Sequence, residues 1–351
     1  MITKETLQKL DPQDMRGYIR GFFEQVEEAV HIGKKYQPKT NSRGITNIVL
    51  AGMGGSAIGG DLLRTYLSAK LKVPFIVNRH YTLPSFVARN SLVIISSYSG
   101  NTEETLEAYE QAVERKAHIL CITSGGEVAD RAKKLRHQVI SIPGGLQPRA
   151  ALGYSFFPLL YAMDKIGFAG IDESEVEETI TVLKTMSGES VDMSDQNFPY
   201  SIAKRLHGKP VIVWSGADLL EVVSVRWRGQ INENAKHCAY SAVFPELNHN
   251  EIVGWEHPAE LLKHFAIVML KDKDDHPRVV QRMAITNELL KNTPDAFVEI
   301  SPRGESRLAR MFSMIHLGDW VSYYLAMLNA VDPTPVERIN YLKSELERAT
   351  M

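Results

Sequence analysis

Short apolar runs alternate with helical stretches through the first half of the chain, and this alternation restricts the possible folds more than any other feature. The runs are rich in β-branched residues and too short for free-standing helices; they cover 45–50, 74–77, 92–96, 118–123 and 139–142. Helical patterns fill the intervals at 59–70, 103–115 and 127–136. Strands and helices that alternate in this way predict a doubly wound parallel sheet with helices on both faces.

The same pattern begins again after Pro210. Strands are expected at 211–214, 265–270 and 296–300, and helices at 219–236, 276–291 and 308–328. We therefore predict an α/β protein of two units, each a parallel sheet flanked by helices in a flavodoxin-like three-layer sandwich. The predicted boundaries are an N-terminal helical segment at 1–40, a first unit at 41–170, a connector at 171–200 and a second unit with C-terminal helices at 201–351.

Size, charge and cysteine content narrow the class of protein. A chain of 351 residues is long for one hydrophobic core, which agrees with two units. A formal net charge of −2 gives no electrostatic case for binding nucleic acid or an anionic membrane. Two cysteines are too few for a disulfide framework, and we find neither an apolar signal core nor a run that approaches a membrane span. We therefore expect a soluble cytoplasmic protein.

The third predicted strand runs into a loop that is dense in hydroxyl groups. Ser97, Ser99 and Thr102 follow the strand, with Gly100 among them, and a helical pattern begins at Glu103. The start of a helix carries unpaired N–H groups and the positive end of the helix dipole, so this loop predicts a site for an anion such as phosphate. The alternative is a plain turn in which the Thr102 side chain caps the helix.

A second loop of small residues follows the first predicted strand and reads Ala-Gly-Met-Gly-Gly-Ser-Ala-Ile-Gly-Gly-Asp at 51–61. Gly54 and Gly55 let the backbone come close to a ligand, and Ser56 places a hydroxyl at a second helix start. We disfavour a nicotinamide cofactor because Asn78 and Arg79, rather than an acidic residue, end the second strand. Since both loops end parallel strands, we expect them to converge on one crevice.

Three further residues are candidates for chemistry. Arg149 follows the fifth predicted strand at the edge where both loops end, although a surface arginine fits this position equally well. Glu233 lies near a predicted helix end among amide side chains, and His249 lies in a loop between two asparagines. A carboxylate and an imidazole are a natural pair for moving protons near neutral pH. On this pattern alone, Glu233 could instead pair with Arg228 or Lys236, and His249 could end a turn.

Two other interpretations of the same region receive less support. The candidate zinc ligands are His237, Cys238, His249, Glu251 and His257. Their spacing matches no tight ligand pair such as Cys-x-x-Cys or His-Glu-x-x-His, so we predict no metal ion here. A role for Cys238 as a catalytic nucleophile is weaker still.

Several of these stretches resemble a known family. Gly-Met-Gly-Gly-Ser-Ala-Ile-Gly-Gly-Asp at 52–61 and Ser-Tyr-Ser-Gly-Asn-Thr-Glu-Glu-Thr at 97–105 resemble the sugar isomerase (SIS) domain. Pro-Arg-Ala-Ala at 148–151, Asn-Glu-Asn-Ala-Lys at 232–236, Glu-Leu-Asn-His-Asn-Glu at 246–251 and Val-Asp-Pro-Thr-Pro-Val at 331–336 narrow the resemblance to the bifunctional phosphoglucose/phosphomannose isomerases. The resemblance implies that a sugar phosphate is held by Gly54, Gly55, Ser56, Ser97, Ser99 and Thr102.

The resemblance also implies roles for five other residues. Glu233 would be the base that moves a proton between C1 and C2 through a cis-enediol(ate), and Arg149 would stabilise the enediolate oxygen. His249 would assist ring opening, in this family often from the partner subunit of a dimer. Lys343 would help to open the ring, and Thr334 would help to admit the C2 epimer.

The implied activity is the interconversion of glucose 6-phosphate and mannose 6-phosphate with fructose 6-phosphate, as in glycolysis or gluconeogenesis. It needs no metal ion and no redox cofactor, and a homodimer with its site near the subunit interface is the expected assembly. A non-catalytic SIS-domain sensor of phosphosugars is the alternative from another class. Amide-sugar synthesis would require a glutamine-hydrolysing domain with an N-terminal cysteine, which the opening Met-Ile-Thr does not offer.

Overall fold

The computed structural model describes residues 8–190, 194 and 196–349. The start of the predicted N-terminal helical segment, and positions 191–193 and 195 of the predicted connector, therefore lie outside the described residues. The chain forms two compact units. The first unit comprises Gly21–Ser187 and Arg303–Ser313, and the second comprises the residues through Arg20, Gly188–Pro302 and the chain from Met314 onwards. Each unit is made of separate stretches of the chain, whereas the boundaries given above are continuous ranges. Those boundaries stay a prediction.

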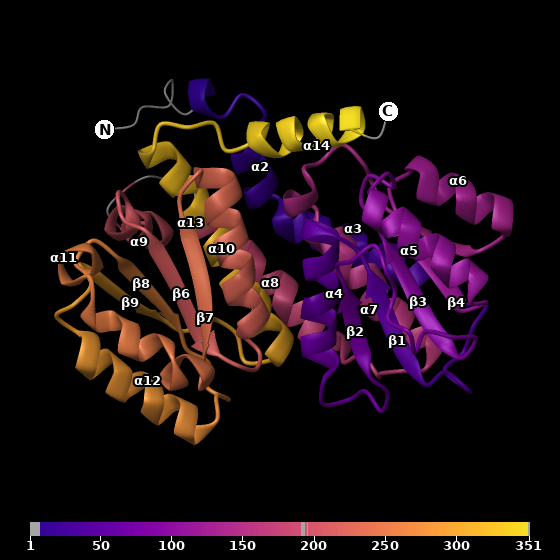
Figure 1. Cartoon of the computed structure of the whole chain (residues 1–351), viewed down its shortest axis with the longest axis horizontal. Coiled ribbons are helices and arrows are strands. Elements are labelled where there is room, and N and C mark those ends of the chain that lie inside the picture. The colour runs from indigo at the N-terminus through magenta and orange to yellow at the C-terminus, as the bar shows by residue number, and fades with distance from the viewer. Residues whose placement is uncertain (1–7, 191–193, 195, 350–351) are drawn as a thin grey trace. The chain divides into compact units, whose positions relative to one another are not determined.

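The first unit contains a sheet of five parallel strands in the order β2-β1-β3-β4-β5 (Figure 1). The strands are β1 Asn47–Ala51, β2 Phe75–Asn78, β3 Ser91–Ser96, β4 His118–Thr123 and β5 Gln138–Ser141. Every residue of β1 and β3 is buried, as expected for central strands that are covered on both faces. The strand order reverses between β1 and β3, and such a switch point is where doubly wound sheets bind ligands.

Helices cover both faces of this sheet. They are α3 Phe22–Lys35, α4 Gly54–Leu67, α5 Glu103–Glu114, α6 Gly126–Leu135, α7 Leu152–Ile166 and α8 Glu173–Glu189. Val49 and Val93 point to the face on which α5 and α6 pack, and they share one core with Tyr109. Leu50, which alternates to the opposite face, lies against Gly60 of α4. The helix α4 begins five residues before the predicted position, so Ser56 lies in its first turn.

The second unit repeats this architecture with four parallel strands in the order β7-β6-β8-β9. The strands are β6 Val211–Gly216, β7 Ala239–Phe244, β8 Ala266–Leu270 and β9 Ala296–Ile300. The order matches that of the first sheet without its last strand. The sequence interpretation missed β7, because this strand at the sheet edge is only partly buried and mixes small and polar residues. The prediction of two parallel sheets flanked by helices is confirmed.

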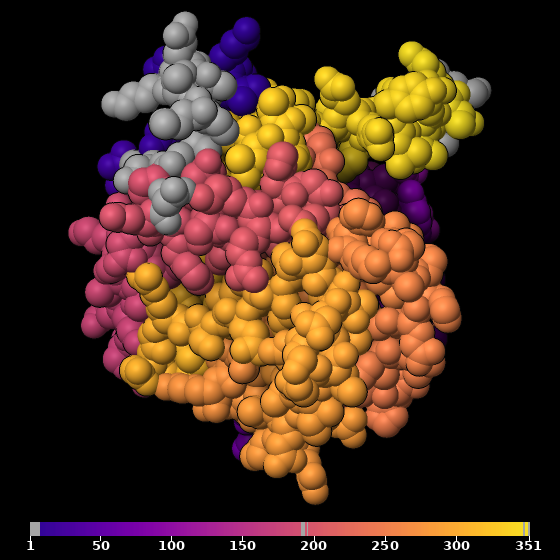
Figure 2. All heavy atoms as spheres, turned by 90° about the vertical axis from the view of Figure 1, so that its left-hand side faces the viewer, coloured from indigo at the N-terminus to yellow at the C-terminus, as the bar shows by residue number. Residues whose placement is uncertain are grey.

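The helices of the second unit are α2 Met15–Arg20, α9 Phe198–Leu206, α10 Glu221–Ala235, α11 Ala259–Leu262, α12 Pro277–Leu290 and α14 Glu337–Ala349, together with the part of α13 that follows Ser313. On one face of the sheet, Trp214 and Ile267 share a core with Met283 of α12. The outer surface on this side is the face that Figure 2 presents, largely in orange. None of the helices in the described parts of the chain is long and apolar enough to cross a membrane.

Helix α13 spans Arg307–Leu328 and is buried along most of its length. Its buried His316 accepts a hydrogen bond on Nε2 from Trp320 Nε1 at 3.1 Å, so this nitrogen carries no proton. Burial lowers the pKa of His316 from 6.5 to about 3, because a charged imidazolium would lose its hydration. The core of the second unit therefore requires a neutral imidazole.

This burial predicts a pH-dependent loss of stability. Below pH 6.5 the unfolded chain takes up a proton that the folded chain refuses until about pH 3, so stability falls as the pH falls. The expected contribution approaches about 1.4 kcal/mol per pH unit for one proton. His316→Gln keeps an acceptor for Trp320 without titrating, and urea unfolding followed by circular dichroism between pH 7 and pH 5 should show a shallower slope for this variant. Parallel slopes for the two proteins would contradict the assignment.

Candidate functional site

Two small-residue loops lie together at the switch point of the first sheet. One follows β1 and contains Ser56, and the other follows β3 and contains Ser97 to Thr102. Ser56 Oγ accepts a hydrogen bond from the backbone N–H of Tyr98 at 3.1 Å, and Ser96 Oγ donates to the Ser56 carbonyl at 3.3 Å. Both serines are buried. The structure thus brings together the two loops that the sequence singled out.

Glycines allow a third segment to join them. A Cβ atom on Gly55 would lie 2.6 Å from the Pro148 carbonyl oxygen, and one on Gly52 would lie 2.7 Å from that of Ser96. Both contacts are with backbone, which cannot rotate away, so only glycine fits. Pro148 opens the short 3₁₀ turn Pro148–Ala150 that carries Arg149, whose side chain is 4% exposed. Arg149 is therefore a buried residue beside the glycine loop and not a surface arginine.

Hydroxyl groups of the second loop are linked to one another. Ser97 Oγ donates to Thr102 Oγ1 at 3.1 Å and accepts from the Gly100 N–H at the same distance. Thr102 occupies the N-cap position of α5, yet its side chain makes no capping hydrogen bond. Thr102 therefore stands at the N-cap position that the alternative gives it, but the expected capping bond from its side chain is absent. Met53, at the N-cap of α4, makes no such bond either, so both helices present positive ends without a side-chain cap.

Glu233 lies in the last turn of α10, in the second unit, and is partly buried. It lines a cavity of about 530 Å³ together with Asn232 and Lys236 of the same helix end and with residues 331–332 and 335–339 of the tail. Thr334 is buried within this tail segment.

Lys343 is exposed on α14, His249 is exposed at the end of the 3₁₀ turn Glu246–His249, and neither lines the cavity.

Buried polar contacts hold α10 against α13. Arg226 donates two hydrogen bonds of 3.0 Å to the carboxylate of Asp319, and Gln230 Nε2 donates a third at 2.7 Å. Burial raises the pKa of Asp319, against the opposing attraction of Arg226. Near the helix end, Asn234 Nδ2 donates to Ser322 Oγ at 3.0 Å. One side of α10 is thereby fixed to α13 close to the turn that carries Glu233.

The switch point of the second sheet, between β6 and β8, has a different chemistry. Its loops carry Asp218, Asp272 and Asp275 where the first sheet carries serines. A Cβ atom on Gly216 would collide with Asp275 Oδ1, so the Asp275 carboxylate lies directly against the end of β6. Burial raises the pKa of Asp275, and the nearby Asp272 and Asp218 raise it further. The switch point of the second sheet thus carries charged side chains, Lys271 and Lys273 as well as the carboxylates, where the first sheet carries hydroxyl groups.

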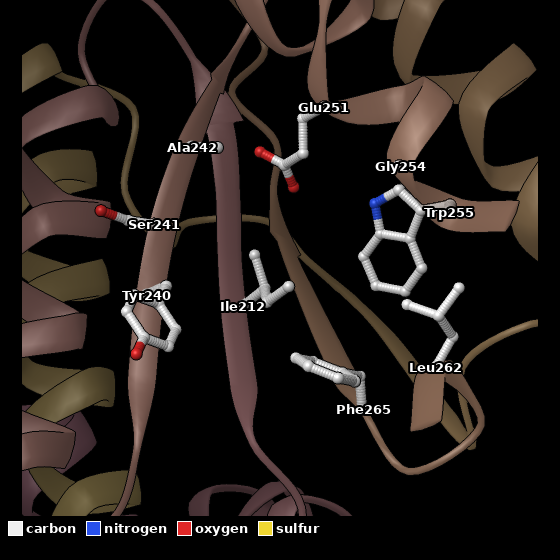
Figure 3. A pocket seen from close by; sticks show the side chains of 9 residues that line it. All are labelled: Ile212, Tyr240, Ser241, Ala242, Glu251, Gly254, Trp255, Leu262 and Phe265. Atoms are coloured by element: carbon white, nitrogen blue, oxygen red, sulfur yellow. The ribbon is translucent and has the colours of Figure 1, made fainter. Parts of the chain in front are cut away.

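A separate cavity of about 260 Å³ lies against the edge of the second sheet (Figure 3). Figure 3 shows the Glu251 carboxylate above Ile212, with the indole of Trp255 beside it. Glu251 Oε1 accepts a hydrogen bond from Trp214 Nε1 at 2.9 Å, and burial raises the pKa of this carboxyl group. Glu251 thus anchors the segment after His249 to the sheet, a role that no sequence pattern indicates. No three His, Cys, Asp or Glu side chains in the described residues are grouped to hold a metal ion.

Comparison with known proteins identifies the class first. Residues 43–144 match the SIS domain, and residues 195–346 match the bacterial phospho-glucose isomerase C-terminal SIS domain. A hypothetical protein from Thermus thermophilus superposes with a TM-score of 0.74 at 16% identity, covering 99% of this chain and 93% of that one. The C-terminal domain of glucosamine-fructose-6-phosphate aminotransferase from Francisella tularensis gives 0.67 at 14% identity, covering 92% and 98%. The protein is thus built from two SIS domains.

Two sequence relatives define the family more narrowly. The bifunctional phosphoglucose/phosphomannose isomerase of Caldicellulosiruptor bescii is 48% identical over 325 residues, which cover 92% of this chain and 96% of the relative. The protein of the same name from Aquifex aeolicus is 38% identical over 331 residues, covering 94% and 97%. The chain belongs to the bifunctional phosphoglucose/phosphomannose isomerase family, and it is an isomerase.

The close packing of Gly55 predicts the effect of a small substitution. Gly55→Ala would push the added methyl group into the Pro148 carbonyl and separate the glycine loop from Arg149. If this loop binds the substrate, isothermal titration with a sugar phosphate should show binding weakened by roughly 10-fold to 100-fold, as for a binding group displaced by about 1 Å. Gly170→Ala is the matched control, because a Cβ at Gly170 meets nothing within 4 Å. Equal affinity for both variants would remove this loop from the binding site.

Proposed function

We propose that the protein interconverts glucose 6-phosphate and mannose 6-phosphate with fructose 6-phosphate by proton transfer through a cis-enediol(ate), without a metal ion. Family membership supports a sugar-phosphate isomerase. The observation that carries the finer proposal is the position of Glu233. A partly buried carboxylate in a rigidly held helix turn, beside a cavity of about 530 Å³, is suited to act as a general base. The sensor alternative has no use for such a base.

In the proposed binding mode, the phosphate group is held by the loops of the first unit. Ser56, Ser97, Ser99 and Thr102 would donate hydroxyl hydrogen bonds, and Gly54 and Gly55 would let the backbone N–H groups approach. The linked hydroxyls of Ser97 and Thr102 and the helix starts without side-chain caps support this assignment. The partial positive charges at two helix N-termini would stabilise the phosphate dianion without a buried lysine.

In the proposed reaction, Glu233 removes the proton from C2 of the open-chain aldose and returns it to C1, while the hydroxyl proton on O2 passes to O1, to give the ketose. Arg149, buried and permanently charged, would stabilise the negative oxygen of the enediolate, which is worth several kcal/mol in a dry site. His249 and Lys343 would assist ring opening, and Thr334 would help to admit the C2 epimer. His249 and Lys343 are exposed and are the least constrained members of the set. Assembly as a cytoplasmic homodimer stays a prediction.

Replacement of the proposed base should separate binding from chemistry. Glu233→Gln preserves the shape of the side chain but removes its basicity, so kcat should fall roughly 10²-fold to 10⁴-fold for both aldose phosphates. Binding of fructose 6-phosphate should change little. The measurement is NMR-detected exchange of the C1 and C2 protons of the hexose phosphates in D₂O. Glu221→Gln, at the opposite end of the same helix, is the control and should keep wild-type exchange.

The same assay tests the metal-free mechanism. Wild-type turnover should survive prolonged treatment with a chelator. Turnover that disappears and returns on addition of a divalent cation would overturn metal independence, and undiminished exchange in Glu233→Gln would assign the base to another residue.

A further inference from the structure

Lys236, which ends helix α10, has a backbone conformation that lysine seldom adopts. Its φ is +51° and its ψ is 36°, in the left-handed region. Helices very often end with a residue in this conformation, and that residue is usually glycine because a Cβ atom makes it strained. Strain of this kind persists where the surroundings fix the residue. At Lys236, the residue is fixed by the hydrogen bonds of its own side chain.

The ammonium group of Lys236 joins two segments that are almost one hundred residues apart. Its Nζ donates to the carbonyl oxygens of Asp332 at 2.7 Å and Pro333 at 3.1 Å, both in the tail. It also donates to the Glu233 carbonyl at 2.9 Å, and the Asn234 carbonyl lies at 3.4 Å. These last carbonyls form the negative end of the helix dipole, which favours a cation.

The contacts exceed what an ordinary lysine at a helix end makes. Such a lysine bonds only to the last carbonyls of its own helix, whereas Lys236 also binds two carbonyls of the tail. A compact ammonium with three donors suits carbonyls that converge from several directions better than a planar guanidinium. Asn329, just before the tail, makes a second link to the end of α10, because its Nδ2 donates a hydrogen bond to the Ala235 carbonyl at 2.9 Å.

Both joined segments border the cavity that contains Glu233. Asn232, Glu233 and Lys236 line it from the helix, and Val331, Asp332 and Pro335 line it from the tail. Asp332 also accepts a hydrogen bond from the Thr334 N–H at 2.8 Å, which shapes the tail at its buried threonine. Lys236 therefore joins the two segments that line this cavity.

We infer that Lys236 is a positioning residue for the isomerase reaction: its ammonium holds the segment Asp332–Thr334 against the last turn of α10 and so fixes the wall that faces Glu233. This inference rests on the proposed function in that Glu233 is taken as the base. It assigns Lys236 no contact with the substrate. The cavity wall, rather than the affinity for phosphate, depends on it.

The test compares Lys236→Met, which keeps the length of the stem but removes the charge, with Lys263→Met. Lys263 is an exposed lysine of the same unit that pairs with Glu260. For Lys236→Met we expect kcat to fall roughly 10-fold to 100-fold with KM changed less than about 3-fold, as for a misplaced reacting group. Hydrogen exchange should accelerate at the amides of 331–336, and Lys263→Met should match the wild type in every measurement.

Chemical rescue separates the charge from the fold. In a Cys238→Ser background, which removes the exposed thiol, Lys236→Cys can be aminoethylated to restore an ammonium at nearly the original position. Restored turnover together with restored protection of 331–336 would support the positioning role. An unchanged kcat in Lys236→Met would overturn it. It would also be overturned if this variant lost both kcat and global thermal stability and aminoethylation restored neither. If the wild type turns over neither aldose phosphate, the proposed function fails, and hydrogen exchange alone still decides whether Lys236 holds the tail.

Discussion

A single buried carboxylate, Asp319, holds the helix that carries the proposed base. It receives two hydrogen bonds from Arg226 and one from Gln230, all inside the second unit. Removing one partner of such a buried pair typically costs about 3–5 kcal/mol, because the remaining charge is left without compensation. The pair also has a fixed geometry, which a purely apolar contact lacks. Together with the bond from Asn234 to Ser322, this pair restricts the rotation of α10, the helix that carries Glu233.

The two sheets show how one architecture can carry different side-chain chemistry at its switch point. Both reverse their strand order at the corresponding place, and in both a small-residue loop follows the central strand. In the first unit the loops contain hydroxyl groups and helix starts without side-chain caps. In the second unit they contain carboxylates, among them Asp275. The proposed phosphate binding therefore depends on the side chains at the switch point and not on the topology alone. In the proposed function the second unit contributes the base from α10 instead.

Much of the fold could be predicted because its signals are local. Every described strand except β7 follows from a short apolar run, and α4, α5, α6, α10 and α12 follow from their periodicity, whereas α7, α9 and α11 were not predicted. The missed strand β7 has small and polar residues at an exposed edge, so its pattern resembles that of a loop. The strand order could not be predicted, since it depends on which buried strands pair and not on any one segment. The convergence of the two loops was nevertheless foreseeable from their places at strand ends.

The site residues could be predicted only where the residue type and its neighbours in the sequence indicate a chemical role. Serines before a helix, and a glutamate among amides, are visible in one sequence. The pairing of Arg226 with Asp319 is not, because 93 residues separate them and many other charges could pair equally well. The left-handed Lys236 left no trace either, since the usual glycine is absent from that position. Long-range contacts and strained backbone are properties of the folded chain.

The division of helix α13 between the units bears on how the protein is made. Phe312, from its first part, packs against Phe22, Phe156 and Phe157 in the core of the first unit. On a ribosome, those three aromatic rings leave the exit tunnel long before Phe312 is synthesised. Until Phe312 is made, the aromatic cluster on α3 and α7 lacks this partner, although the strands of the first sheet and the helices α3 to α7 already exist. A gene cut between the two sheets would leave the first half in that unfinished state permanently.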